Sequence, residues 1–100
     1  MIIVAGTFEV DPAERDAFLA SRADVMRRSR SEEGCLEYCF AADPLEAGRV
    51  VLVERWTSQE ALDRHIAVLR GDGPPAEGDV VPVASSVAVY EVAGARTLGG

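Results

Sequence analysis

The stretch EGCLEYCFAADPLEAGRVVLVERWTSQEALDRHI, residues 33–66, decides the fold of this chain. Apolar and polar side chains alternate across residues 36–40, which is typical of a β-strand, and residues 43–48 supply the proline and glycine of a turn. The apolar, mostly β-branched run at residues 50–53 predicts a second strand. The stretch therefore predicts two strands joined by a short turn.

A helix is expected directly after this second strand. Thr57 and Glu60 stand three residues apart and match a capping box, in which two side chains satisfy free N–H groups at the start of a helix. The apolar residues that follow recur at helical spacing, and His65, the only histidine of the chain, lies among them.

The flanking segments complete an α+β pattern. Residues 2–10 are typical of a first strand and residues 87–92 of a last one. After the first strand, Asp11 as an N-cap and Pro12 at the first helical position predict a helix that extends to about Ser31. The order β-α-β-β-α-β is the ferredoxin-like arrangement, with an antiparallel four-stranded sheet, and the 100 residues are expected to form one domain.

The segment between the second helix and the last strand is expected to be irregular. Residues 71–79 contain the run Gly73-Pro74-Pro75, which cannot continue a helix. Two interpretations are open: a plain surface loop, or a mobile flap over the mouth of a pocket.

The apolar run at residues 50–53 also predicts a homodimer. Its side chains are apolar at consecutive positions, so both faces of that strand should be buried. Two helices can cover only one face of a four-stranded sheet, and a second copy of the chain is the simplest cover for the other.

Short motifs in the decisive stretch are shared with a known family. They are Gly34-Cys35-Leu36 with Tyr38, Glu54 with Trp56, and Ser58 through His65. With these motifs the chain resembles the antibiotic biosynthesis monooxygenase (ABM) superfamily, over about residues 1–70 and again at residues 90–92. The resemblance implies a dimeric α+β barrel. The family includes aromatic-polyketide oxygenases, quinol oxidases, haem-degrading enzymes and members of unknown activity.

Composition narrows the possible partners. A net charge of −7 argues against nucleic acid and anionic membranes as partners, because neither would be attracted electrostatically. The N-terminus has no basic region followed by a long apolar stretch, so we expect a cytoplasmic protein. No glycine-rich phosphate loop follows a strand, and Cys35, Cys39 and one histidine without clustered spacing make a poor zinc site. The sequence therefore predicts neither a bound cofactor nor a metal.

Two polar residues interrupt apolar helix faces. Arg22 falls near the middle of the apolar face of the first helix. Its guanidinium either extends to the rim or to a carboxylate such as Glu54, or it lines a cavity and meets an anionic or phenolate ligand. His65 is either a core histidine bonded to a backbone carbonyl or a second polar group of the same cavity. Both helices should pack on the same side of the sheet, so Arg22 and His65 are the candidate catalytic residues.

Three residues on the two central strands are candidates for substrate contact. Glu54 and Trp56 share one face of their strand, and Tyr38 lies on the neighbouring strand. Each has a structural alternative, because tryptophan and tyrosine are common core or dimer anchors.

The resemblance implies a chemistry that needs no cofactor: oxygenation of an electron-rich phenol, anthrone or quinol by dioxygen. An imidazole has an unperturbed pKa of about 6.5, which suits His65 as the base, and Arg22 suits stabilisation of the phenolate or reduced oxygen. The alternative is a non-catalytic member that binds a small molecule or serves a structural role. Haem degradation is disfavoured, because family members of that kind use an asparagine on the first strand and this chain has none.

Overall fold

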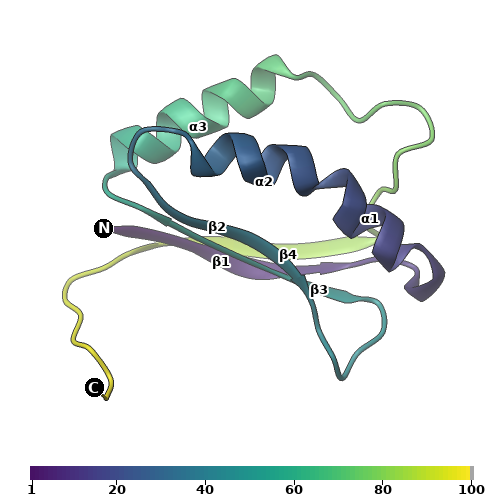
Figure 1. The fold of residues 1–100 in the computed structure, drawn as a ribbon, viewed down its shortest axis with the longest axis horizontal. Coiled ribbons are helices and arrows are strands. Elements are labelled where there is room, and N and C mark those ends of the chain that lie inside the picture. Colours follow the sequence, from purple (N-terminus) through teal and green to yellow (C-terminus); the bar gives the residue numbers. More distant parts are fainter. Residues whose placement is uncertain (100) are drawn as a thin grey trace.

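Alternating side chains build a four-stranded antiparallel sheet, as the computed structural model of residues 1–99 shows (Figure 1). The strands follow the order β2-β3-β1-β4 across the sheet. Together with the helices they confirm the predicted ferredoxin-like β-α-β-β-α-β arrangement. The strands are β1 (Ile2–Glu9), β2 (Cys35–Ala42), β3 (Arg49–Trp56) and β4 (Ala84–Glu91).

The helices all lie on one face of this sheet (Figure 1). They are a 3-10 turn, η1 (Pro12–Glu14), and the helices α1 (Arg15–Ser21), α2 (Ala23–Arg30) and α3 (Gln59–Gly71). Asp11 caps η1 as predicted, because its side chain accepts a hydrogen bond from the Ala13 N–H at 2.8 Å. The prediction of one continuous helix to Ser31 was wrong: at Arg22, with φ −89° and ψ −8°, the chain departs from ideal helical geometry and separates α1 from α2.

The predicted cap of the last helix was also wrong by one residue. The Thr57 N–H donates to the Gly34 carbonyl at 2.9 Å, which ties Thr57 to the start of β2. Ser58 instead takes the extended backbone conformation of an N-cap, and its hydroxyl accepts the Ala61 N–H at 3.1 Å.

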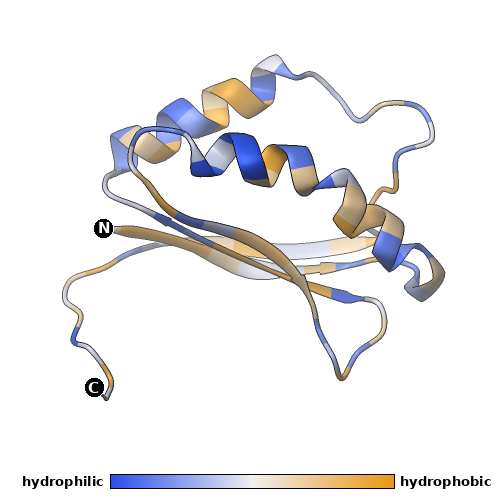
Figure 2. Ribbon diagram, viewed as in Figure 1, coloured by the Kyte–Doolittle hydropathy of each residue, from blue (hydrophilic) through white to orange (hydrophobic). Residues whose placement is uncertain are grey.

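The core lies between the sheet and the helices. Along β3, side chains alternate between buried and half-buried, and the buried set faces the helices. We predicted that both faces of β3 are buried. Within a single chain, only the face toward the helices is buried, and the other face is half-buried. Figure 2 shows hydrophobic residues along the strands, whereas α2 exposes strongly hydrophilic ones. The largest buried apolar side chains are the aromatic ones, Phe18, Tyr38, Phe40 and Trp56.

Gly6 is required for the close pairing of β1 with β4. A Cβ atom at Gly6 would lie 2.0 Å from the Ser86 carbonyl oxygen and 2.6 Å from the Val87 Cα. We expect Gly6→Ala to lower the free energy of unfolding by about 1–3 kcal/mol, because backbone atoms of β4 must move to make room. Thermal and urea unfolding would measure this loss. Gly94→Ala is the matched control, since no heavy atom lies within 4 Å there; equal effects at both positions would contradict the expectation.

The segment after α3 is irregular, as predicted. The chain leaves the helix after Gly71, and Gly73 has φ +76°. Asp72 at the start of this segment forms a two-point ion pair with Arg28 of α2, at 2.5 and 3.2 Å. The flap interpretation stays a prediction.

Within residues 1–99, no helix combines the length and apolar character that crossing a membrane requires.

Candidate functional site

Four of the predicted site residues meet in one cluster under α3. Tyr38 of β2, Glu54 and Trp56 of β3, and His65 of α3 are all buried. The His65 ring centroid lies 4.7 Å from that of Trp56 and 5.2 Å from that of Tyr38. The strand register places Tyr38 directly opposite Glu54, and Trp56 follows two residues later on the same face. The structure therefore brings His65 together with all three residues predicted to contact substrate.

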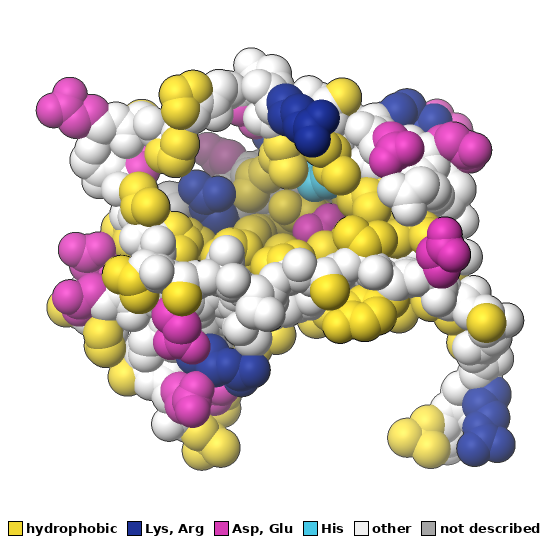
Figure 3. All heavy atoms as spheres, turned by 180° about the vertical axis from the view of Figure 1, so that it is seen from behind, with side chains coloured by type: hydrophobic (Ala, Val, Ile, Leu, Met, Phe, Trp, Pro, Cys, Tyr) yellow, Lys and Arg dark blue, Asp and Glu magenta, His cyan; other side chains and the backbone are white. Residues whose placement is uncertain are grey.

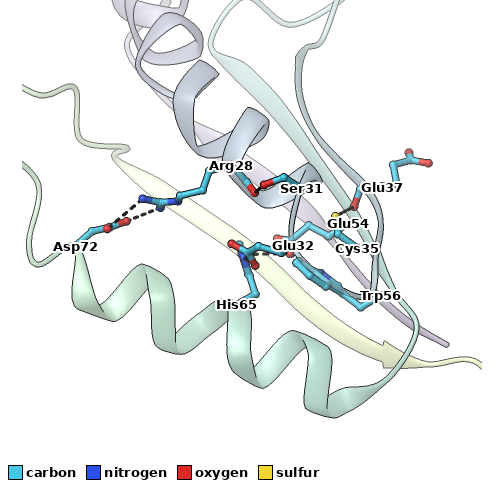
Figure 4. Close-up of polar contacts among 9 residues, drawn as sticks. All are labelled: Arg28, Ser31, Glu32, Cys35, Glu37, Glu54, Trp56, His65 and Asp72. Carbon is cyan, nitrogen blue, oxygen red and sulfur yellow. Dashed lines mark hydrogen bonds and ion pairs between the residues drawn. The ribbon is translucent and has the colours of Figure 1, made fainter.

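A carboxylate that sequence reasoning missed holds the histidine. Glu32, in the turn between α2 and β2, places Oε2 3.0 Å from Nδ1 of His65 (Figure 4). The His65 side chain is 2% exposed and that of Glu32 19%. His65 is thus bonded to a side chain, and the alternative of a backbone carbonyl partner does not hold.

The other ring nitrogen of His65 is free. Its Nε2 atom lies 3.9 Å from Oε1 of Glu54, beyond hydrogen-bond distance, and has no partner among residues 1–99. That Glu54 oxygen accepts the indole N–H of Trp56 at 3.0 Å. Trp56 therefore fixes the carboxylate beside the imidazole without filling its hydrogen-bonding capacity.

Further unpaired polar atoms lie close by. Oε1 of Glu32 and Oγ of Ser29 are buried and form no hydrogen bond within the described part of the chain. Ser29 lies on α2 close enough to Tyr38 to affect its ionisation. Buried polar atoms normally have partners, so the unpaired Nε2 of His65 indicates a place for water or for the polar group of a ligand.

The cluster disfavours negative charge. Burial raises the pKa of the Glu54 carboxyl, and the Trp56 N–H and His65 offset part of that rise. Burial also raises the pKa of the Tyr38 hydroxyl, and the nearby Glu54 carboxylate raises it further. Tyr38 is therefore a neutral hydroxyl at physiological pH.

Arg22 lies apart from His65. It sits at the junction of α1 and α2, its Nε donates to the Ser21 hydroxyl at 3.3 Å, and its guanidinium carbon lies 5.4 Å from the centre of the Phe18 ring. The two candidate catalytic residues are thus not in contact, although the positive charge of Arg22 acts to lower the pKa of Tyr38.

Two clefts flank the cluster. The first, of about 490 Å³, lies between α2, the end of α3 and the loop after it, and Arg22, Arg28 and Leu69 are part of its lining. Leu69 is one helical turn from His65. The second, of about 340 Å³, is lined by Tyr38 with Arg30, Cys35, Leu36 and Glu37. Arg22 and Tyr38 line different clefts, and His65 lines neither of the two. The cavity bordered by both Arg22 and His65 stays a prediction.

The sheet is open on the side of β4. Val87 and Val89 are 42% and 53% exposed, although the register places them beside Gly6 and Val4 on the face that the helices cover elsewhere. Figure 3 shows a hollow between the helical layer and the sheet on this side, with hydrophobic side chains along its floor and the histidine at its wall. An apolar ring could reach the cluster through this opening.

Comparison with known proteins establishes the family. The model of the family described as "Antibiotic biosynthesis monooxygenase" matches residues 1–67, which is 67 of the 100 residues. This chain belongs to that family. An uncharacterized Synechocystis protein, sll1783, is 30% identical over 97% of this chain and 67% of its own length. "Putative monooxygenase YcnE" of Bacillus subtilis is 28% identical over 78% of this chain and 82% of its own.

Solved structures agree with the fold of this family member. The structure of Rv0793 from Mycobacterium tuberculosis superposes with a TM-score of 0.75 at 25% identity, over 96% of this chain and 98% of the other.

Among residues 1–99 of the present chain, no three His, Cys, Asp or Glu side chains are arranged to hold a metal ion. The cluster contains one buried imidazole nitrogen without a hydrogen-bond partner, aromatic side chains around it and neighbouring carboxyl groups.

The buried Glu54 carboxyl should make stability depend on pH. Because its pKa is raised in the folded state above the ordinary value of 4.5, the folded protein keeps this proton to a higher pH than the unfolded chain does. The free energy of unfolding should therefore fall as pH rises from 4.5 through the folded-state pKa, and then stay level. Glu54→Gln removes this titration and keeps an acceptor for the Trp56 N–H.

Urea unfolding between pH 4 and 8 would test this expectation. The Glu54→Gln variant should gain stability over the wild-type protein as the pH rises, with the two closest at acid pH. Glu77→Gln, an exposed carboxylate in the loop after α3, is the control and should parallel the wild-type protein. A wild-type advantage that grows with pH would show that the Glu54 carboxylate is stabilised, and would contradict the argument.

Proposed function

We propose that this protein oxidises an electron-rich aromatic hydroxyl compound, a phenol, anthrone or quinol, with dioxygen and without a bound cofactor. The observation that carries the proposal is the free Nε2 of His65, a buried imidazole held at Nδ1 by Glu32 and surrounded by Tyr38 and Trp56. Family membership supports the reaction class.

The chemistry needs a base and a dry aromatic site more than it needs a cofactor. His65 Nε2 removes the hydroxyl proton, and the phenolate gives one electron to dioxygen. The two radicals then join at a ring carbon that bears hydrogen, opposite the hydroxyl in a phenol or anthrone and next to it in a hydroquinone. Loss of water from that peroxide leaves a quinone. One oxygen atom of dioxygen becomes the new carbonyl oxygen. The other leaves as water, together with one hydrogen from the ring carbon and one from the hydroxyl. The substrate therefore supplies all four electrons that reduce dioxygen.

We assign the remaining predicted residues to binding and to charge stabilisation. Tyr38, Glu54 and Trp56 would contact the substrate, because each lies against or beside the His65 ring. Arg22 would stabilise negative charge on the phenolate or on reduced oxygen from the neighbouring cleft. In support, its guanidinium forms no ion pair within residues 1–99, and its charge acts on Tyr38.

Oxygen uptake with a panel of hydroquinones and anthrones tests this proposal. The expected result is uptake of one dioxygen per quinone formed, without added metal, flavin or nicotinamide, and above the rate of spontaneous oxidation. Binding of panel members without uptake would instead favour the alternative of a non-catalytic small-molecule-binding protein. Haemin added in a separate titration tests the third possibility, haem degradation, through loss of the haem absorbance.

We also propose that the protein is a homodimer built on the bare face of the sheet. No helix of residues 1–99 covers that face (Figure 1), and its central positions are apolar. Light scattering at micromolar concentration should give twice the chain mass of 10.7 kDa. A mass of 10.7 kDa alone would refute the dimer. The apolar side chains of this face are Ile3, Ala5, Cys39, Ala41, Val51, Val53, Ala88 and Tyr90.

A further inference from the structure

Glu32 exchanges no proton with the substrate in the proposed reaction, yet it makes the shortest polar contact of the His65 ring, at 3.0 Å. It follows α2, in a turn where Glu32 N–H donates to the Ser29 carbonyl at 3.0 Å. This turn points the carboxylate at the imidazole (Figure 4). Within residues 1–99, His65 is the only charged or titratable side chain that pairs with Glu32. Arg28, one turn earlier, is engaged by Asp72.

The contact fixes where the imidazole proton resides. An ionised carboxylate can only accept hydrogen bonds, so at the 3.0 Å contact Nδ1 of His65 must donate. In a neutral imidazole the other nitrogen, Nε2, then carries a lone pair. In the opposite tautomer, the unprotonated Nδ1 would face the Glu32 carboxylate oxygen, and both atoms are acceptors. The proton would then be on Nε2, which has no acceptor within hydrogen-bond distance.

The groups that face the ring favour the same arrangement. Glu32 faces it from the turn after α2, Glu54 from β3 and the Tyr38 ring from β2. Glu54 does not compete for the imidazole proton, because its Oε1 stays 3.9 Å away and accepts the Trp56 N–H. Trp56 and Tyr38 pack against the ring, and Glu32 is the hydrogen-bond partner that decides between its two tautomers.

We propose that Glu32 is the positioning residue of this site: it holds His65 with the proton on Nδ1, so that Nε2 accepts the hydroxyl hydrogen of the substrate. This inference deepens the proposed oxygenase function and rests on it for the identity of the substrate. It also restricts the ligand class. The unpaired Nε2 and the Oε1 oxygen of Glu54, 3.9 Å from it, both accept hydrogen bonds, so the site selects a neutral hydroxyl donor over an aromatic carboxylate of the same size.

Nuclear magnetic resonance tests the tautomer directly, because the chain has one histidine and its ring gives a single set of signals. A long-range ¹H–¹⁵N correlation spectrum of the uniformly ¹⁵N-labelled wild-type protein at neutral pH should show Nδ1 protonated and Nε2 unprotonated. A proton on Nε2 would overturn the inference, whether or not the protein turns over any substrate.

Two variants at Glu32 separate positioning from charge. Glu32→Ala should populate the Nε2–H tautomer and lower kcat for the best hydroquinone at least about tenfold. KM should rise by a smaller factor, because Nε2 no longer accepts the hydroxyl hydrogen of the bound substrate. Glu32→Gln keeps a carbonyl that accepts Nδ1–H, and should retain the wild-type tautomer and most of the turnover. Glu33→Gln removes the adjacent, exposed carboxylate and is the matched control.

The outcomes distinguish this inference from the proposed function. An unchanged tautomer in Glu32→Ala, or a loss in Glu32→Gln as large as in Glu32→Ala, would overturn positioning by Glu32. Absence of turnover in every protein, together with the expected tautomers, would remove the oxygenase proposal and leave Glu32 as the residue that sets hydroxyl binding. In that case Glu32→Ala should weaken hydroquinone binding and leave benzoate binding unchanged.

Discussion

His65→Asn should lower the turnover number for hydroquinones and anthrones by about 10²- to 10⁴-fold, the range that a positioned general base contributes. The asparagine amide nitrogen takes the place of Nδ1 and can still donate to Glu32, so the fold should survive. No group then replaces the lone pair of Nε2. KM should change much less than kcat, because proton removal is needed in the transition state and not for binding.

Two further variants, Arg64→Ala and His65→Ala, make the test of His65→Asn specific. Arg64→Ala alters an exposed neighbour on α3 and should leave kcat unchanged. His65→Ala should lose as much activity as His65→Asn but more stability, since it leaves the largely buried Glu32 carboxylate without its partner. If His65→Asn keeps the wild-type kcat, His65 is not the base, and the non-catalytic interpretation gains its strongest support.

The sequence predicted the fold because its signals are local. Alternation along the strands, the turn at residues 43–48 and the proline-rich segment at residues 73–75 each act within a few residues. The structure contains an element for each of these signals. The break at Arg22 was missed because neither glycine nor proline marks it. The cap was misplaced because two hydroxyl residues stand side by side, and a contact from Thr57 to distant Gly34 decides between them.

The site was predictable only where strand and helix periodicity apply. Periodicity placed Glu54, Trp56 and His65 on the faces that meet in the core, and the structure brings them together. Glu32 could not be found this way, because it precedes His65 by 33 residues and belongs to a turn. One weak signal was present: a carboxylate just beyond a helix C-terminus faces the negative end of the helix dipole, so something else must favour it there.

The placement of Arg22 shows the limit of helical projection. A helical projection shows toward which face a side chain points, but not which side chains of other elements lie at the same height. Arg22, at the break between α1 and α2, lies over the Phe18 ring and lines the larger cleft. The role that we propose for Arg22 thus depends on where the substrate extends from the His65 cluster. An aromatic system of several rings would span more of that separation than a single ring.

Trp56→Ala should lower the free energy of unfolding by about 3–5 kcal/mol, the typical cost of removing a large aromatic side chain from a core. Trp56 is fully buried, and it packs on both His65 and Tyr38. The substitution also removes the N–H that Glu54 accepts. Urea unfolding at constant protein concentration would measure the loss. A change below about 1 kcal/mol would mean that the cluster collapses to fill the space.

Trp56→Phe separates the hydrogen bond from the packing. It keeps a buried ring but leaves the Glu54 carboxylate without its N–H donor, which should cost about 1–3 kcal/mol beyond the lost volume. In a Glu54→Leu background that added cost disappears, because there is no carboxylate left to satisfy. The double-mutant cycle should therefore show a coupling between the two positions of about 1 kcal/mol or more. Strict additivity would mean that solvent or Glu54 itself reorganises to replace the bond, and that Trp56 acts only through packing. A measurable coupling would instead show that the indole N–H holds Glu54 in place, which is what keeps its oxygen 3.9 Å from Nε2 and leaves that nitrogen free for a substrate.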